Sequence, residues 1–311
     1  MKKTCLITVT ILLAASAFSQ DPLAPGDHFA QINGIRMHYY VSGKGPVCLL
    51  PSPGWGPSIN YLKSTLQPLE HYFTIAYYDT RMSGESSGPE DTTRYTAADF
   101  MADMDSLRIY LHQEKIWLMG HSDGGFQILN YGIHHNDKLN GMIVIDGVAG
   151  DDSLRAAELT RIMSKRKGLP YYQKGMDIFS GKDTTNYSIT EASRILLPFY
   201  FHDSTKMKEF LQLGAIQMSE KAHRYATAAK FDAAYLFPEL GKITAPTLVV
   251  VGDDDFVCDK VSQADRIVKN ISSSTEIVIE NAGHFCWFEQ PGQFFRDCGN
   301  WLETKGVKKQ N

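Results

Sequence analysis

Short apolar runs alternate with helix-like segments along most of this chain, and this alternation limits the folds open to it more than any other feature. The runs are apolar throughout rather than at every second residue, which is typical of strands buried on both faces. Among the helix-like segments, the clearest begins at the capping-box pair Thr96 and Asp99. Strand and helix in alternation predict an α/β fold with a mainly parallel sheet flanked by helices. The runs assigned to this sheet are 47–50, 73–78, 115–119, 142–145, 247–251 and 276–279.

The alternation breaks at two places. Near the start, two strand-like runs flank Asn33-Gly34, a strong hairpin signal because both turn positions need positive φ, so antiparallel strands should open the fold. Later, residues 150–241 carry helical periodicity and no convincing strand, although a crossover between parallel strands needs only one helix. We therefore predict an α/β core in two parts, 20–149 and 242–311, around an inserted helical cap, 150–241.

The first residues have the three-part layout of a secretory signal peptide. Met1-Lys2-Lys3 is basic, an apolar run follows over 5–15, and small residues continue to Ser19. This run is too short to cross a bilayer of about 30 Å, which takes about 20 residues in a helix, and no later stretch reaches that length. We expect residues 1–19 to be removed and the protein to be exported, to the periplasm or beyond, without a membrane span.

Charge and motif content exclude several other functions. Lys and Arg number 31 against 35 Asp and Glu, for a net charge of −4, and no polybasic run is present. Nucleic acids and anionic membrane surfaces are therefore not expected as partners. The sequence has no H-E-x-x-H motif, no paired C-x-x-C and no glycine-rich phosphate loop, so neither a metal nor any other cofactor is implied. Its oligomeric state is left open.

One motif carries the chemistry. Gly120-His121-Ser122-Asp123-Gly124 fits G-x-S-x-G, and it lies between the strand-like run 115–119 and a helical run over 126–133. In that context the backbone turns sharply and lifts the serine oxygen above the sheet, while glycines avoid collisions with neighbouring backbone. Ser122 is therefore our candidate nucleophile.

A serine hydroxyl needs a histidine base, which a carboxylate usually orients. His284 follows the last strand-like run and so should lie at the sheet edge where the carboxyl ends of the strands open. The acid should come from the loop after the preceding strand, and that loop offers Asp253, Asp254 and Asp255. Asp146, which follows an earlier strand, is a reserve candidate.

The order serine, acid, histidine is that of α/β-hydrolases, and nearly the whole mature chain resembles an α/β-hydrolase of the proline iminopeptidase-like group. Residues 78–86 resemble that group's D-x-R-G-x-G-x-S segment, and 252–255 resemble its G-x-x-D acid loop. Gly283-His284-Phe285, with Glu289 and Pro291, resembles its histidine loop. The resemblance implies an α/β-hydrolase fold with Asp255 as the acid, which makes Asp253 and Asp254 part of a solvated acidic loop.

The segment after the third strand departs from that group. The group usually carries H-G-G-P-G, whereas this chain has Leu50-Pro51-Ser52-Pro53-Gly54-Trp55-Gly56. Proline has no N–H to donate to an oxyanion. With the P-G part in register, the backbone amides of Ser52 and Asp123 should form the oxyanion hole, where losing one donor costs about 3 kcal/mol. Trp55, His121 and Phe285 are candidate substrate contacts. Trp55 could equally serve packing, and for His121 packing or a hydrogen bond is favoured over a role in the chemistry.

The expected reaction is two-step acyl transfer from a small-molecule ester, lactone or short peptide, with the substrate read by the cap and oxyanion segment. The altered oxyanion segment favours an ester or lactone hydrolase. Exported capped hydrolases of this kind also resemble serine esterases that open macrolide rings. Two alternatives remain. One is an iminopeptidase, which would need acidic side chains around a substrate ammonium. The other is a non-catalytic binding protein on the same scaffold. The acidic candidates are Glu209, Glu220, Glu239 and Glu289.

Four cysteines would remain after export: Cys48, Cys258, Cys286 and Cys298. Export to an oxidising compartment permits disulfides, and buried free thiols are the alternative. Cys258 lies near Asp255 and Cys286 near His284 in the sequence, so a bridge between these two could join the acid and base loops if their Cα atoms come within about 7 Å.

Overall fold

A computed structural model of the chain describes residues 21–89, 91–213 and 217–310, and the predicted signal peptide lies outside them. One sheet has the strand order β1-β2-β4-β3-β5-β6-β7-β8. Every neighbouring pair from β4 to β8 is parallel, and only the two pairings of β2 are antiparallel. The predicted α/β architecture with a mainly parallel sheet is therefore confirmed. The strands are β1 (Gly26–Ile32), β2 (Ile35–Gly43), β3 (Val47–Pro51), β4 (Thr74–Tyr78), β5 (Ile116–His121), β6 (Leu139–Ile145), β7 (Thr247–Gly252) and β8 (Ser274–Ile279).

The predicted hairpin is also present. Asn33 and Gly34 both have positive φ, 46° and 83°, and the flanking residues Ile32 and Ile35 pair across the turn. Asparagine and glycine tolerate this conformation at little cost, so the local sequence is sufficient to set the register of β1 against β2.

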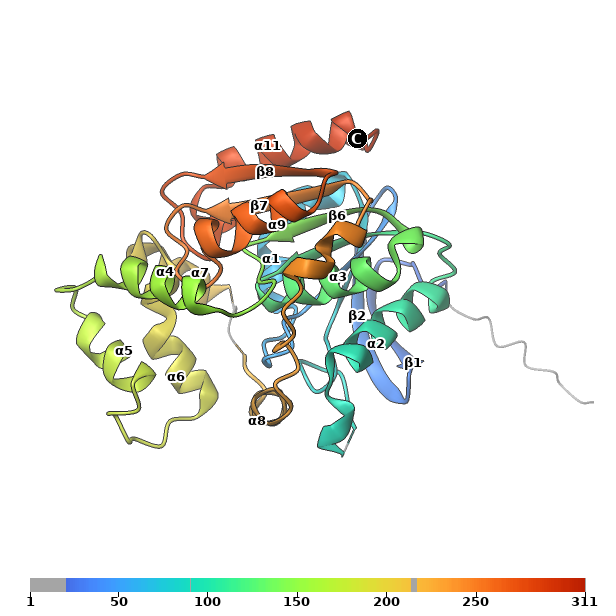
Figure 1. Ribbon diagram of the computed structural model, residues 1–311. Coiled ribbons are helices and arrows are strands. Elements are labelled where there is room, and N and C mark those ends of the chain that lie inside the picture. The colour runs from blue at the N-terminus through green and yellow to red at the C-terminus, as the bar shows by residue number, and fades with distance from the viewer. Residues whose placement is uncertain (1–20, 90, 214–216, 311) are drawn as a thin grey trace, which may run out of the picture.

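Helices cover both faces of the sheet and bury a separate core on each. Successive residues of a strand point to opposite faces, so Leu49 of β3 lies in one core and Leu50 in the other. The first core packs against α2 (Ala97–Tyr110), α3 (Asp123–His134) and α9 (Asp265–Asn270), which lie on the same side of the sheet in Figure 1. The second packs against α1 (Asn60–Thr65), α10 (Cys286–Glu289) and α11 (Pro291–Thr304). The Thr96–Asp99 capping box starts α2 as predicted.

Residues 150–241, which we call the insertion, form helices joined by turns and loops, and their described part contains no strand apart from an isolated bridge between Pro57 and Met218. Figure 1 shows α4 to α7 grouped together on the side toward which β7 and β8 point. The insertion therefore stands next to the edge of the sheet where those strands end. Its helices are α4 (Ser153–Ser164), α5 (Tyr172–Phe179), α6 (Ile189–Leu196), α7 (Met207–Gln212) and α8 (Glu220–Ala229).

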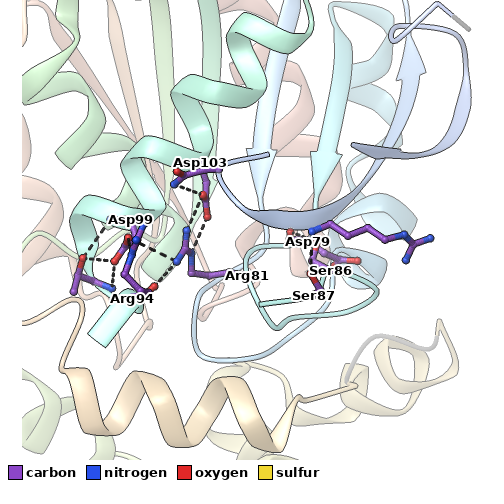
Figure 2. A network of polar contacts seen from close by, with 10 residues as sticks. Asp79, Arg81, Ser86, Ser87, Arg94, Asp99 and Asp103 are labelled. Atoms are coloured by element: carbon purple, nitrogen blue, oxygen red, sulfur yellow. Dashed lines mark hydrogen bonds and ion pairs between the residues drawn. The ribbon is translucent and has the colours of Figure 1, made fainter. Parts of the chain in front are cut away.

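A buried polar network fixes the loop after β4 (Figure 2). Arg81 forms two hydrogen bonds to the Asp103 carboxylate, at 2.8 and 2.7 Å, and a third to the carbonyl of Arg94. Asp79 accepts the backbone N–H of Ile59 at 2.8 Å. Buried charges are tolerated when they are paired and hydrogen-bonded in this way. The network ties the loop to α2 and to the start of α1, beside the segment that follows β3.

No helix within the described residues is both long and apolar enough to cross a membrane.

Candidate active site

Ser122 occupies a strained turn between β5 and α3. Its backbone has φ 59° and ψ −123°, a conformation that a non-glycine residue adopts only where the surrounding structure imposes it. Two glycines make the turn possible: a Cβ on Gly120 would lie 2.2 Å from the carbonyl oxygen of Gly124, and one on Gly125 would lie 2.7 Å from Cα of Gly147. The predicted strand, turn and helix around this serine are therefore present.

His284 and Asp255 form a buried pair at the same edge of the sheet. His284 Nδ1 lies 2.8 Å from Asp255 Oδ2, and both side chains are almost fully buried. Asp255 also accepts the N–H of Val257 at 2.7 Å, which fixes the carboxylate. The backbone N–H of His284 donates to the carbonyl of Tyr200, in the insertion, at 2.8 Å. The acid and base loops are thus held in place both by each other and by the insertion.

Ser122 and His284 line one cavity of about 470 Å³, a size within the range of small-molecule sites. The three predicted triad residues follow β5, β7 and β8, and the shared direction of these strands brings their loops to one edge of the sheet. Within the described residues, the Ser122 hydroxyl makes no hydrogen bond to the His284 ring. Such hydrogen bonds often tighten only when substrate binds.

The other acidic candidates have different partners. Asp254 does not belong to a solvated loop as expected, since it forms ion pairs with Lys165 at 2.9 Å and Arg166 at 3.2 Å. Asp253 accepts the N–H of Ala282 at 3.2 Å. Both residues therefore hold loops together rather than orient His284.

Asp146 is fully buried next to the pair but does not bond to His284. It accepts the N–H of Gly252 at 2.8 Å, and Cys286 lies against the same carboxyl group. Burial, together with the negative charge of Asp255, raises the pKa of Asp146 well above its ordinary value. Contact geometry thus selects Asp255 as the partner of the histidine.

The prediction that Ser52 donates to an oxyanion is wrong. Its N–H donates to the carbonyl of Tyr78 at 2.9 Å, which extends the β3–β4 ladder by one residue beyond the Pro51–Tyr78 pair. Ser52 is fully buried, and its hydroxyl bonds to Thr80. An amide already paired in the sheet cannot point at a reacting carbonyl in the cavity.

Among the backbone amides of residues 53–56, only that of Trp55 has no acceptor in the part of the chain that the structure describes. Gly54 donates to the Asp123 carboxylate at 2.8 Å, Gly56 donates to the carbonyl of Pro53, and Pro53 has no N–H. For the N–H of Trp55 the described residues provide no acceptor, and Trp55 lines the cavity. Asp123 also lines it, at the first position of α3 where backbone amides lack helical acceptors.

The predicted substrate contacts Trp55, His121 and Phe285 all line the cavity. Both nitrogens of the His121 ring are engaged by the protein, however: Nε2 lies 2.8 Å from the carbonyl of His284 and Nδ1 lies 2.9 Å from the Tyr61 hydroxyl. Burial lowers the pKa of His121 well below its ordinary value, which keeps the ring neutral. This histidine is therefore placed to support the His284 loop.

The acidic residues that reach the cavity are not those expected from the sequence. Glu209, Glu220, Glu239 and Glu289 do not line it, and Glu289 instead accepts the N–H of Gly283 at 2.6 Å. Those that do line it are Asp123, Asp151 and Asp232. Asp151 and Asp232 belong to the insertion, so their position depends on how its helices fold back. No sequence motif signals that position.

The predicted bridge between Cys258 and Cys286 is absent, because all four cysteines in the described residues are free and buried. Cys286 lies against the carboxyl of Asp146, whereas Cys258 faces the Asp255–His284 pair.

Cys258, Asp255 and His284 each offer one atom that can ligate a metal, and these three atoms lie within 4.8 Å of one another. Two of those atoms already bond to each other. Burial also raises the pKa of the Cys258 thiol well above its ordinary value, so the thiolate that a metal requires is disfavoured. The donor set fits a hydrogen-bonded pair better than a metal centre.

Comparison with known proteins agrees with this geometry. A family profile described as an alpha/beta hydrolase fold matches residues 47–291. A proline iminopeptidase from Saccharolobus solfataricus is 25% identical over 281 residues, which cover 86% of this chain and 88% of that protein. A soluble epoxide hydrolase from Corynebacterium sp. is 26% identical over 282 residues, which cover 87% and 94%. Among solved structures, proline iminopeptidase from Mycobacterium smegmatis superposes with a TM-score of 0.73 at 16% identity, covering 90% of this chain and 98% of that one.

Proposed function

Because the chain belongs to the alpha/beta hydrolase fold family, we propose that it is a serine hydrolase that cleaves a carboxylic ester or lactone through Ser122. The observation that carries this proposal is the hydrogen-bonded pair of His284 and Asp255, which shares a cavity with a serine held on a strained turn. Nucleophile, base and orienting acid are the three groups that acyl transfer through serine requires.

In the proposed mechanism, Asp255 binds Nδ1 of His284 and leaves Nε2 to take the proton of the Ser122 hydroxyl. The serine oxygen attacks the substrate carbonyl, and the alkoxide leaving group departs with the proton held by His284. Water then loses a proton to His284, attacks the acyl-enzyme and releases the carboxylic acid, which restores Ser122. No cofactor is required for any step.

The oxyanion formed in each step needs two donors. We assign them to the backbone amides of Asp123 and Trp55, since both residues line the cavity and neither amide has an acceptor within the described residues. The N-terminus of α3 adds a favourable dipole at the first of these positions. Trp55 thus takes the role that the sequence suggested for Ser52.

The ester or lactone preference rests on the departure of residues 50–56 from the H-G-G-P-G pattern. A macrolactone is the bulkiest substrate in this class. We include it in the proposal because residues of the insertion form part of the cavity wall. Export after removal of residues 1–19 is part of the same proposal. A proline iminopeptidase is the second candidate, favoured by the name of the Saccharolobus solfataricus relative and by the carboxyl groups in the cavity.

The test compares p-nitrophenyl butyrate with proline β-naphthylamide as substrates of the wild-type protein and of Ser122→Ala. We expect hydrolysis of the ester, its loss in the variant, and a lower kcat/KM for the amide. A higher kcat/KM for the prolyl amide would reverse the ranking of the two candidates. A fluorophosphonate probe distinguishes the third possibility, because a non-catalytic binding protein would leave Ser122 unlabelled.

A further inference from the structure

The loop that carries Asp255, residues 253–258, is bound on either side of this aspartate by arginines of the insertion. We propose that one of them, Arg155, is a positioning residue. It fixes Val257, and through Val257 the carboxylate of Asp255, in the orientation that His284 requires. The inference rests on the proposed function and adds a residue of the insertion on which the rate of that reaction depends.

A short series of hydrogen bonds connects Arg155 to the acid by way of a single residue. The guanidinium donates from Nε and Nη2 to the carbonyl of Val257, at 3.1 and 2.9 Å. The N–H of Val257 donates to Oδ1 of Asp255 at 2.7 Å, and Oδ2 of the same carboxylate lies 2.8 Å from Nδ1 of His284. Arg155 therefore holds Val257 at its carbonyl, while the N–H of Val257 sets the rotation of the carboxylate.

The start of α4 sets the place of Arg155. Asp152 caps this helix and accepts the backbone N–H groups of Leu154 and Arg155, at 3.0 and 3.1 Å. The Arg155 side chain is 17% exposed, and its Nη1 pairs with Asp151, whose side chain is 74% exposed. An ion pair with so exposed a carboxylate contributes little. Two parallel bonds to one carbonyl, in contrast, use the planar fork that only a guanidinium provides.

Contacts of the neighbouring residues restrict the same stretch of backbone. Arg166, which is almost fully buried, donates from Nη2 to the carbonyl of Asp254 at 3.1 Å and to its carboxylate at 3.2 Å. The Phe256 ring packs against that of Tyr200, in the insertion, with centroids 5.0 Å apart. The residues before and after Asp255 are thus anchored to the insertion, so the position of the acid depends on the insertion as well as on β7.

Arg155 differs from Arg166 in one way that makes its role accessible to experiment. Arg155 lines the catalytic cavity, whereas Arg166 does not. Truncation to alanine at residue 155 removes the atoms of an ethylguanidinium ion and leaves a space that opens into that cavity. A small cation from solution can therefore reach the place of the lost guanidinium.

The first test measures steady-state hydrolysis of p-nitrophenyl butyrate. In Arg155→Ala we expect kcat to fall by about a hundredfold, as a shift of about 1 Å in a catalytic group can cause, while KM changes by less than about threefold. Arg155→Lys keeps the charge and one donor, so its kcat should lie between those of Arg155→Ala and the wild type. Arg161→Ala is the matched control and should keep the wild-type kcat, because Arg161 lies on the same helix but is exposed and pairs with Glu158.

The second test adds ethylguanidinium to Arg155→Ala, which separates positioning from general damage to the fold. The ion replaces the atoms that were removed, so we expect kcat to rise by at least about tenfold as the acid returns to its place. Ethylammonium has the charge without the planar fork and should restore less. A kcat in Arg155→Ala close to that of the wild type, a loss that ethylguanidinium leaves unchanged, or equal recovery with ethylammonium would each overturn the inference.

A measurement without substrate distinguishes failure of this inference from failure of the proposed function. The Nδ1 proton of His284, shared with Asp255, should give a far-downfield ¹H NMR signal that Asp255→Asn removes. In Arg155→Ala we expect this signal to shift or to disappear through exchange with water, and ethylguanidinium to restore it. An unchanged signal would overturn the inference even if the wild-type protein cleaves the ester.

If the signal responds as expected but the wild-type protein neither cleaves the ester nor reacts with the fluorophosphonate probe, the serine hydrolase proposal fails and the positioning of Asp255 by Arg155 stands. Circular dichroism establishes that each variant is folded. Should Arg155→Ala not fold, the kinetics and the NMR signal of Arg155→Lys decide the inference, and wild-type behaviour of both would contradict it.

Discussion

Two buried aspartates at the carboxyl edge of the sheet form hydrogen bonds to different partners, and we therefore expect different roles for them. Asp255 bonds to the His284 ring at 2.8 Å, whereas Asp146 bonds to a backbone amide of the β7 end. A carboxylate that orients the base is essential to acyl transfer, while a neighbour that only supports the loop is not.

We therefore expect Asp255→Asn to lower kcat by about ten-thousand-fold, since the amide can no longer hold His284 in the required tautomer. Asp146→Asn is the matched control and should lower kcat by less than about tenfold. Steady-state kinetics with p-nitrophenyl butyrate give both values. A larger loss in the Asp146 variant would mean that this residue is the working acid.

Asp123 should also make stability depend on pH. Its pKa in the folded protein is about 7, against an ordinary value of 3.8, so the folded state binds the proton more tightly than the unfolded state. The resulting stabilisation is complete below about pH 4 and is lost as the pH rises through 7. Relative to the wild type, Asp123→Asn should therefore gain about 2 kcal/mol of unfolding free energy between pH 5 and pH 8. Urea titrations at both pH values measure the difference in unfolding free energy between Asp123→Asn and the wild type. The same difference at pH 5 and at pH 8 would contradict the prediction.

The sequence predicted where the candidate triad residues lie, because each of them sits in a clear local context, while their catalytic roles stay predictions. Ser122 lies at a strand-to-helix turn, and the loops of Asp255 and His284 follow neighbouring strands, so their convergence could be inferred. Ser52 was misassigned because its N–H extends a ladder by one residue, and strand ends cannot be located that accurately from sequence. Asp232 could not be found at all, since the fold of the insertion brings it to the cavity.

At the scale of elements, the turn from β5 to α3 depends on backbone contact that only glycine permits. We expect Gly120→Ala to cost about 2 to 3 kcal/mol of unfolding free energy, because the new Cβ would lie 2.2 Å from the carbonyl oxygen of Gly124. Gly292→Ala, in the first turn of α11, meets nothing within 4 Å and should leave stability unchanged or slightly raised. Chemical denaturation measures the unfolding free energy of both variants. Similar losses of unfolding free energy in Gly120→Ala and Gly292→Ala would show that the steric contact at Gly120 does not cause the destabilisation.

The elements themselves were predictable to different degrees. Strands such as β3 and β7 are buried along their whole length, so a continuous apolar run identifies them. The helices of the insertion are short and pack through aromatic side chains that lie far apart in the chain, such as Phe199 against Phe256. Their helical character could be predicted, but not their bounds, and the division of the chain into separate domains stays a prediction.

At the scale of the whole molecule, the insertion and the catalytic loops are joined by hydrogen bonds to buried groups. Glu289 accepts the N–H groups of Gly283, His202 and Asp203, and so links the histidine loop to the insertion. Because His284 also donates its N–H to the carbonyl of Tyr200, a movement of the insertion would displace His284, the proposed base.

The cysteines provide a test of the proposed export and of the removal of residues 1–19. The sequence has 5 cysteines, and removal of residues 1–19 would leave the four that are free and fully buried in the structure. Burial raises the pKa of each of these thiols, so they should be unreactive while the protein is folded. Titration of the protein recovered from the exporting cell, with a thiol reagent and no reductant, should therefore find no reactive thiol in the native state and four after denaturation in guanidinium. Five thiols would mean that the leader is retained, and two would mean that a disulfide forms after export.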